Sequence, residues 1–458
     1  MHPDFRIQMQ AQLGAAFADF ADALVQPAPV SIRANRHKWP GPAQHYGQVL
    51  WCENGYYLAE RPQFTLDPLL HAGAYYVQEA SSMSIAHALR QLVDLENPLL
   101  ALDLAAAPGG KSTLLAGMLS ADSLLIANEV IRNRYQALRH NLARWGLPNV
   151  AVSQHDPEDF APLAGSFDLV LVDAPCSGEG LFRKDPDAQK EWSPAQVGFC
   201  AARQRRILAQ AAALMAPGGV LVYSTCTYND EENAANAAWL QEVAGLEYAP
   251  VNWPSEWGVE ERRWGYQFYP HRVRGEGVYV ACFRKGGAGG RQWAVGSGRW
   301  AVGGSRALRG VSGWQLVGGS RREVLEPWLE DGGDFGFWQN KQGGLWALPR
   351  AVEGYFVEAA GVLRRMEPIL EMGEIKGGDL IPAGALALST ALAKAIPATA
   401  LDREQAIRFL RKEDPQLPSA PKGWLAAQYE GHTLGWLKGL GNRVNNYFPK
   451  EWRILGRF

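Results

Sequence analysis

Cys176 and Cys226, two of the five cysteines in the chain, have the surroundings of reactive thiols. Each stands just beyond a short apolar run, Phe167 to Val172 for the first and Val220 to Tyr223 for the second. Such runs are typical of buried parallel strands, and open α/β sheets bind ligands beyond the carboxyl ends of these strands. We therefore expect Asp173, Cys176 and Cys226 to face one cleft, with thiol chemistry carried by the two cysteines.

A glycine turn earlier in the chain indicates a nucleoside site. The sequence DLAAAPGGK, from Asp103 to Lys111, joins a predicted strand to a helix, and its small residues let the backbone approach a ligand. It departs from GxGxxG and GxxxxGK[ST], which disfavours a dinucleotide or ATP. Glu129 ends the next strand, where a carboxylate can accept both ribose hydroxyls, and Asp156, after the third strand, could hold an adenine amino group. The predicted cofactor-binding residues are Ala105, Ala106, Ala107, Pro108, Gly109, Gly110, Lys111, Glu129, Asp156 and Asp173.

Strands and helices alternate around these residues as in a doubly wound α/β domain. Strands are predicted at residues 99–104, 124–128, 149–153, 167–172, 220–225 and 278–283. Helices are predicted between them at residues 111–119, 131–145, 194–216 and 231–244. This arrangement brings the acids after the first strands and the two cysteines to one edge of a parallel sheet.

Composition limits the class of protein. A length of 458 residues with 47% hydrophobic content is enough for several packed domains. A formal charge of −2 argues against a uniformly basic nucleic-acid binder, although local basic surfaces remain possible. Five cysteines without a CxxC pair favour a reducing compartment, and no spacing suggests zinc. We expect a cytoplasmic protein without a metal or a membrane segment.

The regions on either side of this domain are simpler. An amphipathic helix is predicted over residues 4–24, followed by short strands at 48–52 and 56–58 of a small α+β unit. Arg33 and Arg36 in that unit are either solvated or in contact with an RNA backbone. Residues 286–320 contain 12 glycines and no acid, which favours a linker, although a basic, tryptophan-bearing linker could also touch nucleic acid.

The last part of the chain has the pattern of small mixed modules. Residues 335–348 and 354–363 are predicted to form short strands and turns. Asp402 and Gln405 resemble a capping box at the start of a helix. The final segment carries more basic than acidic residues, which is typical of a substrate-binding module. Its basic residues are Lys422, Lys438, Arg443, Lys450, Arg453 and Arg457.

Three of these motifs together carry a family resemblance. DLAAAPGGK, DAPCSGEG and STCTY, with YYVQEASSM upstream, resemble the motifs of the NOL1/NOP2/Sun family of RNA cytosine-C5 methyltransferases. The resemblance is strong over about residues 30 to 285. The C-terminal sequence is similar to the tail of bacterial members that modify small-subunit (16S) ribosomal RNA and end in a PUA-like RNA-binding module. The resemblance implies a Rossmann-like class I methyltransferase sheet with S-adenosyl-L-methionine as the cofactor.

The resemblance also implies roles for the site residues. Cytosine C5 is too weak a nucleophile to take a methyl group until a thiolate adds to C6, and the family's attacking sulfur matches Cys226. Removal of the C5 proton matches Cys176. Asp173 is expected to bind the N3/N4 edge of the cytosine and to stabilise charge on the ring. Lys184 is our candidate for a nearby substrate-side cation that lowers the pKa of Cys226.

With the family in view, the chain is expected to divide into five parts. These are an N-terminal α+β RNA-binding domain (1–68), a methyltransferase domain (69–285), a glycine-rich linker (286–320), a small α+β module (321–375) and a PUA-like RNA-binding domain (376–458). The expected partner is ribosomal RNA or the small ribosomal subunit, and we expect a monomer.

Other functions remain open at this point. The substrate could be transfer RNA or large-subunit RNA, or the chain could be a non-catalytic ribosome-assembly protein. A DNA-type cytosine methyltransferase would exchange the two cysteine roles, because Cys176 follows a proline. Amino-group methylation would call for an aromatic residue where Cys176 stands.

Overall fold

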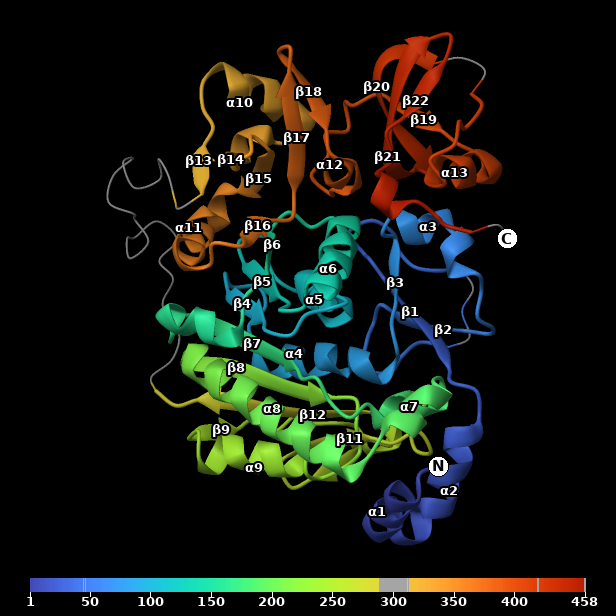
Figure 1. Ribbon diagram of the computed structural model, residues 1–458, viewed down its shortest axis with the longest axis vertical. Helices are drawn as coiled ribbons and strands as arrows, with labels where there is room; N and C mark the ends of the chain where they lie inside the picture. Colours follow the sequence, from blue (N-terminus) through green and yellow to red (C-terminus); the bar gives the residue numbers. More distant parts are fainter. Residues whose placement is uncertain (44, 46, 288–310, 312, 418–419, 457–458) are drawn as a thin grey trace.

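A mixed β-sheet of ten strands lies at the centre of the part of the chain that the computed structural model describes (Figure 1). The model describes all residues except 44, 46, 288–310, 312, 418–419 and 457–458. The strands follow in the order β10 (Glu260–Arg262), β11 (Gly265–Phe268), β12 (Val278–Lys285), β8 (Met215–Thr225), β7 (Phe167–Asp173), β4 (Leu100–Asp103), β5 (Leu124–Asn128), β6 (Val150–Ser153) and β16 (Met366–Pro368), with β9 (Leu246–Tyr248) beside β12.

The middle of this sheet is parallel, and its connections reverse direction between β4 and β7. β4 pairs in parallel with both β5 and β7, β5 pairs with β6, and β7 pairs with β8. β12 runs antiparallel to β8. Because the chain leaves β4 first toward β6 and later toward β8, the loops after β4 and β7 diverge at the carboxyl edge, where α/β sheets bind ligands.

Helices cover both faces of the sheet, which confirms the predicted doubly wound fold. One core holds Ala101 of β4 together with α4 (Ile85–Leu92), α5 (Gly110–Ala116) and α6 (Arg132–Trp145). The other core holds Leu100 and Leu102 with α8 (Pro194–Leu214) and α9 (Ala234–Glu242). Successive residues of β4 therefore face opposite layers, as strand geometry requires. β8 begins at residue 215, five residues before the predicted start, because the segment after α8 already pairs with β7.

The N-terminal helix is broken, contrary to the prediction of one helix over residues 4–24. α1 (Pro3–Leu13) and α2 (Phe17–Val25) are separated at Gly14, whose φ of 53° no helix can continue. Both helices lie beside α7 (Pro186–Glu191) at the bottom of Figure 1. Their aromatic residues pack against the segments that follow β7 and β8. This cluster consists of Phe5, Met9, Phe20, Leu24, Phe182, Trp192, Val197, Tyr228 and Tyr269.

A three-stranded antiparallel sheet follows these helices. Its order is β2 (Gly55–Leu58), β1 (Val30–Ala34) and β3 (Tyr75–Val77). The strand predicted at 48–52 is wrong, since only Gln48 forms a single bridge, with Tyr56. β3 also lies beyond residue 68, so this sheet crosses the boundary expected between the first two domains.

The five-stranded sheet of the middle region lies above the central sheet in Figure 1. It consists of β13 (Trp314–Leu316), β14 (Phe335–Asn340), β15 (Leu345–Pro349), β17 (Glu371–Lys376) and β18 (Asp379–Pro382). β13 lies within the expected linker, and residues 288–310 and 312 of that linker are outside the described residues. α11 (Glu353–Val362) replaces the strands and turns predicted at 354–363, because Tyr355, Phe356, Ala359 and Ala360 form one buried helical face.

The C-terminal region forms a four-stranded sheet. Its strands are β19 (Ala398–Ala400), β20 (Ala420–Tyr429), β21 (His432–Gly441) and β22 (Val444–Asn446), joined by α13 (Arg403–Leu410). The capping box of Asp402 and Gln405 at the start of α13 is confirmed. This sheet shares a hydrophobic cluster with Ala72, directly after α3 (Pro68–His71). Since β17 and β18 extend past residue 375, the domain division stays a proposal and its boundaries need to follow the sheets.

Candidate active site

The two cysteines meet where β7 and β8 end. Cys176 and Cys226 have their Sγ atoms 2.9 Å apart, and the backbone N–H of Cys226 points to the Cys176 sulfur at 3.3 Å. The parallel pairing of the strands, with Asp173 opposite Ser224, sets this approach. Hydrogen bonding to the Cys226 thiol and burial together raise the pKa of Cys176 well above its usual value. Cys176 is therefore a protonated thiol at neutral pH.

A buried lysine stands next to this pair. Lys111, in the first turn of α5, places Nζ 2.6 Å from Oδ1 of Asp173, and Ser224 donates to the same oxygen at 2.9 Å. Burial by itself lowers the pKa of Lys111, but the charges of Asp173 and Cys226 outweigh it and raise the pKa. Lys111 is therefore a cation that connects the loop after β4 with the reacting residues.

The predicted cation, Lys184, lies elsewhere. Its side chain is 47% exposed, and its Nζ lies 2.7 Å from Oε2 of Glu276. Among the described residues, Lys184 therefore forms its ion pair with Glu276 and not with a residue of the cysteine loops. The cation that interacts electrostatically with Cys226 is Lys111. A role for Lys184 in binding the substrate stays a prediction.

Beneath the two cysteine loops lies a buried carboxylate that the sequence analysis did not identify. Glu232 accepts hydrogen bonds from Ser177 N at 3.0 Å, from Gln204 Nε2 at 2.7 Å and from Asn229 Nδ2 at 2.8 Å. Its side chain is fully buried, and burial raises its pKa. Glu232 thus joins the loop after β7, helix α8 and the loop after β8.

Glu179 is a second buried carboxylate in the same place. It accepts from the backbone N–H groups of Tyr228 and Asn229 at 2.7 and 3.1 Å and from Trp192 Nε1 at 3.1 Å. Gly180, its neighbour, donates to the carbonyl of Cys226 at 2.8 Å, and a Cβ at that glycine would come within 3.1 Å of the same oxygen. The GEG of DAPCSGEG therefore fixes the backbone that carries Cys226.

The loop after β4 is closely packed and has the conformation expected of a ligand-binding turn. Gly109 precedes α5 with φ 112°, and a Cβ at Gly110 would lie 3.3 Å from the ring of Tyr76. Asp103, at the end of β4, is fully buried and accepts from Ser112 Oγ at 2.6 Å, while its Oδ1 has no hydrogen-bond partner among the described residues. Burial raises the pKa of Asp103 to about 7. Ala105 to Pro108 complete the turn between these residues.

The two other predicted acids follow β5 and β6. Glu129 is 5% exposed, accepts from Ile131 N at 2.9 Å and faces Arg134 at 3.5 Å, and Arg134 also donates to the carbonyl of Ala107. Asp156 caps the short helix that follows it and lies 3.5 Å from Arg206. Glu129 is thus joined to the glycine-turn loop, whereas Asp156 serves its own turn. Their contacts with ribose and adenine stay predictions.

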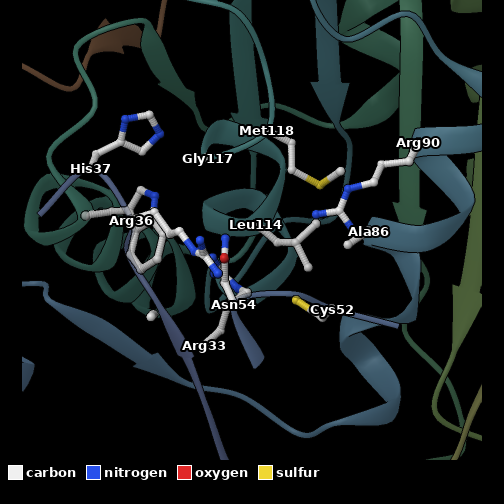
Figure 2. A pocket seen from close by; sticks show the side chains of 12 residues that line it. Arg33, Arg36, His37, Cys52, Asn54, Ala86, Arg90, Leu114, Gly117 and Met118 are labelled. Carbon is white, nitrogen blue, oxygen red and sulfur yellow. The ribbon is translucent and has the colours of Figure 1, made fainter. Parts of the chain in front are cut away.

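Arg33 is buried rather than at the surface, so neither expectation for it holds. Figure 2 shows it pointing into the space between the N-terminal strands and the helices of the central domain. It donates to Gln78 Oε1 and Thr113 Oγ1, both at 2.7 Å, and stacks over Trp145. The adjoining space has a volume of about 20 Å³, which is enough for about one water, so the N-terminal sheet and the central domain are closely packed around Arg33. Arg36 is exposed, and its contact with RNA stays a prediction.

This arrangement fits S-adenosylmethionine. A glycine turn after β4, an acid after β5 and an unpaired buried oxygen on Asp103 suit a nucleoside cofactor with an amino-acid end. Among the described residues, no group of three or more His, Cys, Asp or Glu side chains could hold a metal ion. None of the described helices is long and apolar enough to cross a membrane.

Solved structures of other proteins share this fold. A methyltransferase homolog protein from Pyrococcus horikoshii is 27% identical, with a TM-score of 0.50 over 62% of this chain and 100% of its own. NSun6 from the same organism, solved with the S-adenosylmethionine analogue SFG, shares the fold at 20% identity, with a TM-score of 0.52 over 62% of this chain and 98% of its own. Fold and site define a class I methyltransferase that uses S-adenosylmethionine.

Relatives of the full chain narrow this class. The ribosomal RNA small subunit methyltransferase F of Escherichia coli O139:H28 is 32% identical over 98% of this chain and 96% of its own length, and that of Enterobacter sp. strain 638 is 31% identical over 98% and 95%. The chain belongs to the RsmF family of 16S ribosomal RNA methyltransferases. Family models for 16S rRNA methyltransferase RsmB/F, for the RsmF N-terminal domain and for the RsmF PUA domain match residues 90–284, 1–80 and 397–454.

Proposed function

We propose that this enzyme methylates C5 of a cytosine in small-subunit ribosomal RNA through a temporary bond between Cys226 and C6 of the base. The observation that carries the proposal is the pair of thiols 2.9 Å apart, with Lys111 and Asp173 beside them. Methylation of a ring carbon needs a nucleophile and a base, whereas methylation of an amino group or a hydroxyl needs no thiol. Two cysteines with different surroundings supply both functions.

The first step is addition. The Cys226 thiolate forms a bond to C6, and the electron pair of the C5–C6 double bond moves toward C5 and the ring. Asp173, held in place by its ion pair with Lys111, accepts a hydrogen bond from the N4 amino group and holds the base. Because Asp173 is itself an anion, the group that offsets the negative charge gained by the ring is Lys111. This moves the charge-stabilising role that we expected of Asp173 to its partner.

The second step is transfer followed by elimination. Bound S-adenosylmethionine would supply its sulfonium methyl group to C5 and would be left as S-adenosylhomocysteine. Cys176, which is protonated at rest, first passes its thiol proton to solvent. As a thiolate it then accepts the proton that leaves C5, the bond between C6 and sulfur breaks, and the electrons of that bond return to Cys226. The raised pKa of Cys176 suits this step, because a thiolate of high pKa holds a proton strongly. The same property argues against Cys176 as the attacking sulfur.

The test compares two variants in the full-length protein with labelled S-adenosylmethionine and small-subunit RNA. Cys226→Ala should form no product and no adduct, because nothing remains to add to C6. Cys176→Ala should transfer the methyl group but leave the RNA attached to the enzyme in denaturing electrophoresis. Cys200→Ala, which alters a buried cysteine of α8, is the matched control and should behave as the wild type. Thermal unfolding of each variant excludes loss of the fold.

The outcome separates the alternatives. An adduct in Cys226→Ala and none in Cys176→Ala would reverse the two roles. Nucleoside analysis of the product identifies the methylated atom, and parallel reactions with transfer RNA, large-subunit RNA, DNA and assembled small subunits identify the substrate. Absence of 5-methylcytosine from every reaction of the wild type would sink the proposed chemistry. The cytoplasm remains the expected compartment, since that is where ribosomal RNA would meet such an enzyme.

A further inference from the structure

A polar pocket lies outside the active site, between the middle region and the edge of the central sheet. It has a volume of about 380 Å³. Lys341, in the turn between β14 and β15, and Arg364 and Arg365, just before β16, line it together with Gln342, Asn340 and Gln154. The pocket therefore combines three cations with amide groups that can donate hydrogen bonds.

These cations are not neutralised by the described part of the protein. Lys341, Arg364 and Arg365 are exposed, and no side-chain ion pair or hydrogen bond occupies them within the described residues. The acid in the lining, Glu367, is already engaged by Arg139 at 2.6 Å and by the hydroxyl of Tyr135. Residues 288–312 add no acid to the sequence. An unpaired positive pocket of this size attracts an anion.

Sheet topology places this pocket on the same edge as the reacting residues. β16 runs antiparallel to β6, with Met366 opposite Ser153, so Arg364 and Arg365 lie beyond the carboxyl end of β6. The strands β16, β6, β5, β4, β7 and β8 are neighbours in that order. Five spacings of about 4.8 Å put the pocket roughly 24 Å from the end of β8, where Cys226 stands.

We propose that this pocket binds the phosphodiester backbone of the substrate RNA, away from the modified base. The proposal rests on an RNA substrate, as proposed above, and assigns a function to the middle region. A gap of roughly 24 Å corresponds to about seven stacked nucleotides at 3.4 Å each. Arginine forks and amide groups suit phosphate oxygens, and contacts of this kind position an RNA without reading its sequence.

The experiment removes the three charges together and compares a matched set. The pocket variant is Lys341→Gln/Arg364→Gln/Arg365→Gln. The control is Arg321→Gln/Lys376→Gln/Lys394→Gln, which removes three exposed charges from the surrounding region without touching the pocket. Binding of small-subunit RNA is measured over a range of salt concentrations, alongside kcat at saturating RNA and affinity for S-adenosylmethionine.

The pocket variant should bind RNA about tenfold or more weakly at low salt, and its salt slope should fall by about 2, since each lost phosphate contact on a single strand contributes about 0.7. Its kcat and cofactor affinity should match the wild type, and the control should bind RNA within about twofold of it. Equal losses in both variants, or no loss in the pocket variant, would overturn the proposal. The binding readout does not depend on which atom is methylated, so failure of the proposed chemistry would be visible separately.

Discussion

The carboxyl edge of the central sheet has two halves that are built differently. The reacting half, after β7 and β8, is tied together over long sequence distances: Glu232 and Glu179 collect donors from both loops and from Gln204 of α8. In the cofactor half, after β4, β5 and β6, the two predicted acids accept their backbone hydrogen bonds locally, since Glu129 accepts from Ile131 and Asp156 caps its own turn. Changes in the reacting half should therefore reduce stability and activity together, whereas changes in the cofactor half should mainly reduce affinity.

Of the changes that test this comparison, removal of Glu232 should have the largest effect on stability and activity. Glu232→Ala leaves the Ser177 N–H without an acceptor, removes one of the acceptors shared by Gln204 and Asn229, and leaves a gap in a buried site. Because each hydrogen bond to a charged group contributes about 1.5 to 3 kcal/mol, we expect a loss of about 3 kcal/mol in the free energy of unfolding. Methylation should be lost even below the melting temperature, because both cysteine loops lose their anchor. Glu231→Ala, at the exposed neighbouring position, should change stability by less than about 0.5 kcal/mol. Denaturant unfolding of the two variants, read with their activity, checks this, and equal stabilities would show that the buried network does not fix the loops.

Lys111 connects the two halves, so its replacement should lower the rate of methylation. Lys111→Met removes the cation beside Asp173 and should lower kcat by roughly 100- to 1000-fold, the usual effect of losing one charge-stabilising group. Lys184→Met is the matched control and should leave kcat nearly unchanged, since Lys184 pairs with Glu276. Single-turnover methylation at saturating RNA and cofactor measures both. A large loss in the Lys184 variant alone would restore our original assignment of the cation.

In the cofactor half, Glu129→Ala should weaken S-adenosylmethionine binding by roughly ten- to over a hundredfold, as expected for the loss of charge-assisted hydrogen bonds. Asp156→Ala is the comparison, because it removes a helix cap worth about 1 kcal/mol and should weaken binding less. Calorimetric titration gives both affinities. If Asp156→Ala is the more damaging change, the adenine end of the site is more important than the ribose contact.

A pH series on Asp103 tests the cofactor half through stability rather than through affinity. Its pKa is about 7 in the folded protein, against an ordinary value of 3.8, because burial favours the protonated acid. A raised pKa contributes stability that is full below about pH 4 and is lost as the pH rises through 7. The unfolding free energy of the wild type minus that of Asp103→Asn should therefore fall between pH 4 and 7. A difference that does not vary over this range would place Asp103 in a more polar environment than its burial indicates.

The parallel strands and the reacting cysteines could be predicted because both have local signals. Apolar runs ending in a polar residue give the strands, and parallel topology brings their ends to one edge. Glu179 and Glu232 could not be found this way, because glutamate is rarely buried and no local pattern marks it when it is. Their partners are also distant in the sequence: Ser177, which donates to Glu232, lies about fifty residues before it. The prediction that Arg33 lies at the surface was wrong for the same reason, since its hydrogen-bond partner Thr113 lies 80 positions away in the sequence.

The helix α11 shows a different limit. Residues 354–363 contain glycine, valine and aromatic residues that favour strands and turns, and only packing of one face against the central core decides for a helix. Whether Cys226, Cys176 and Asp173 have the roles predicted for them depends on the variants above.

β16 also determines which truncated forms of the protein can stay in solution. It covers β6, the last parallel strand of the central sheet, yet it comes from residues well past β12. A fragment ending near residue 285 would present the backbone N–H and C=O groups of β6 to any passing strand, including that of another copy. Such a fragment should precipitate or form oligomers at concentrations where the whole chain stays dispersed. The middle region would then be needed for solubility of the enzyme as well as for its hold on RNA.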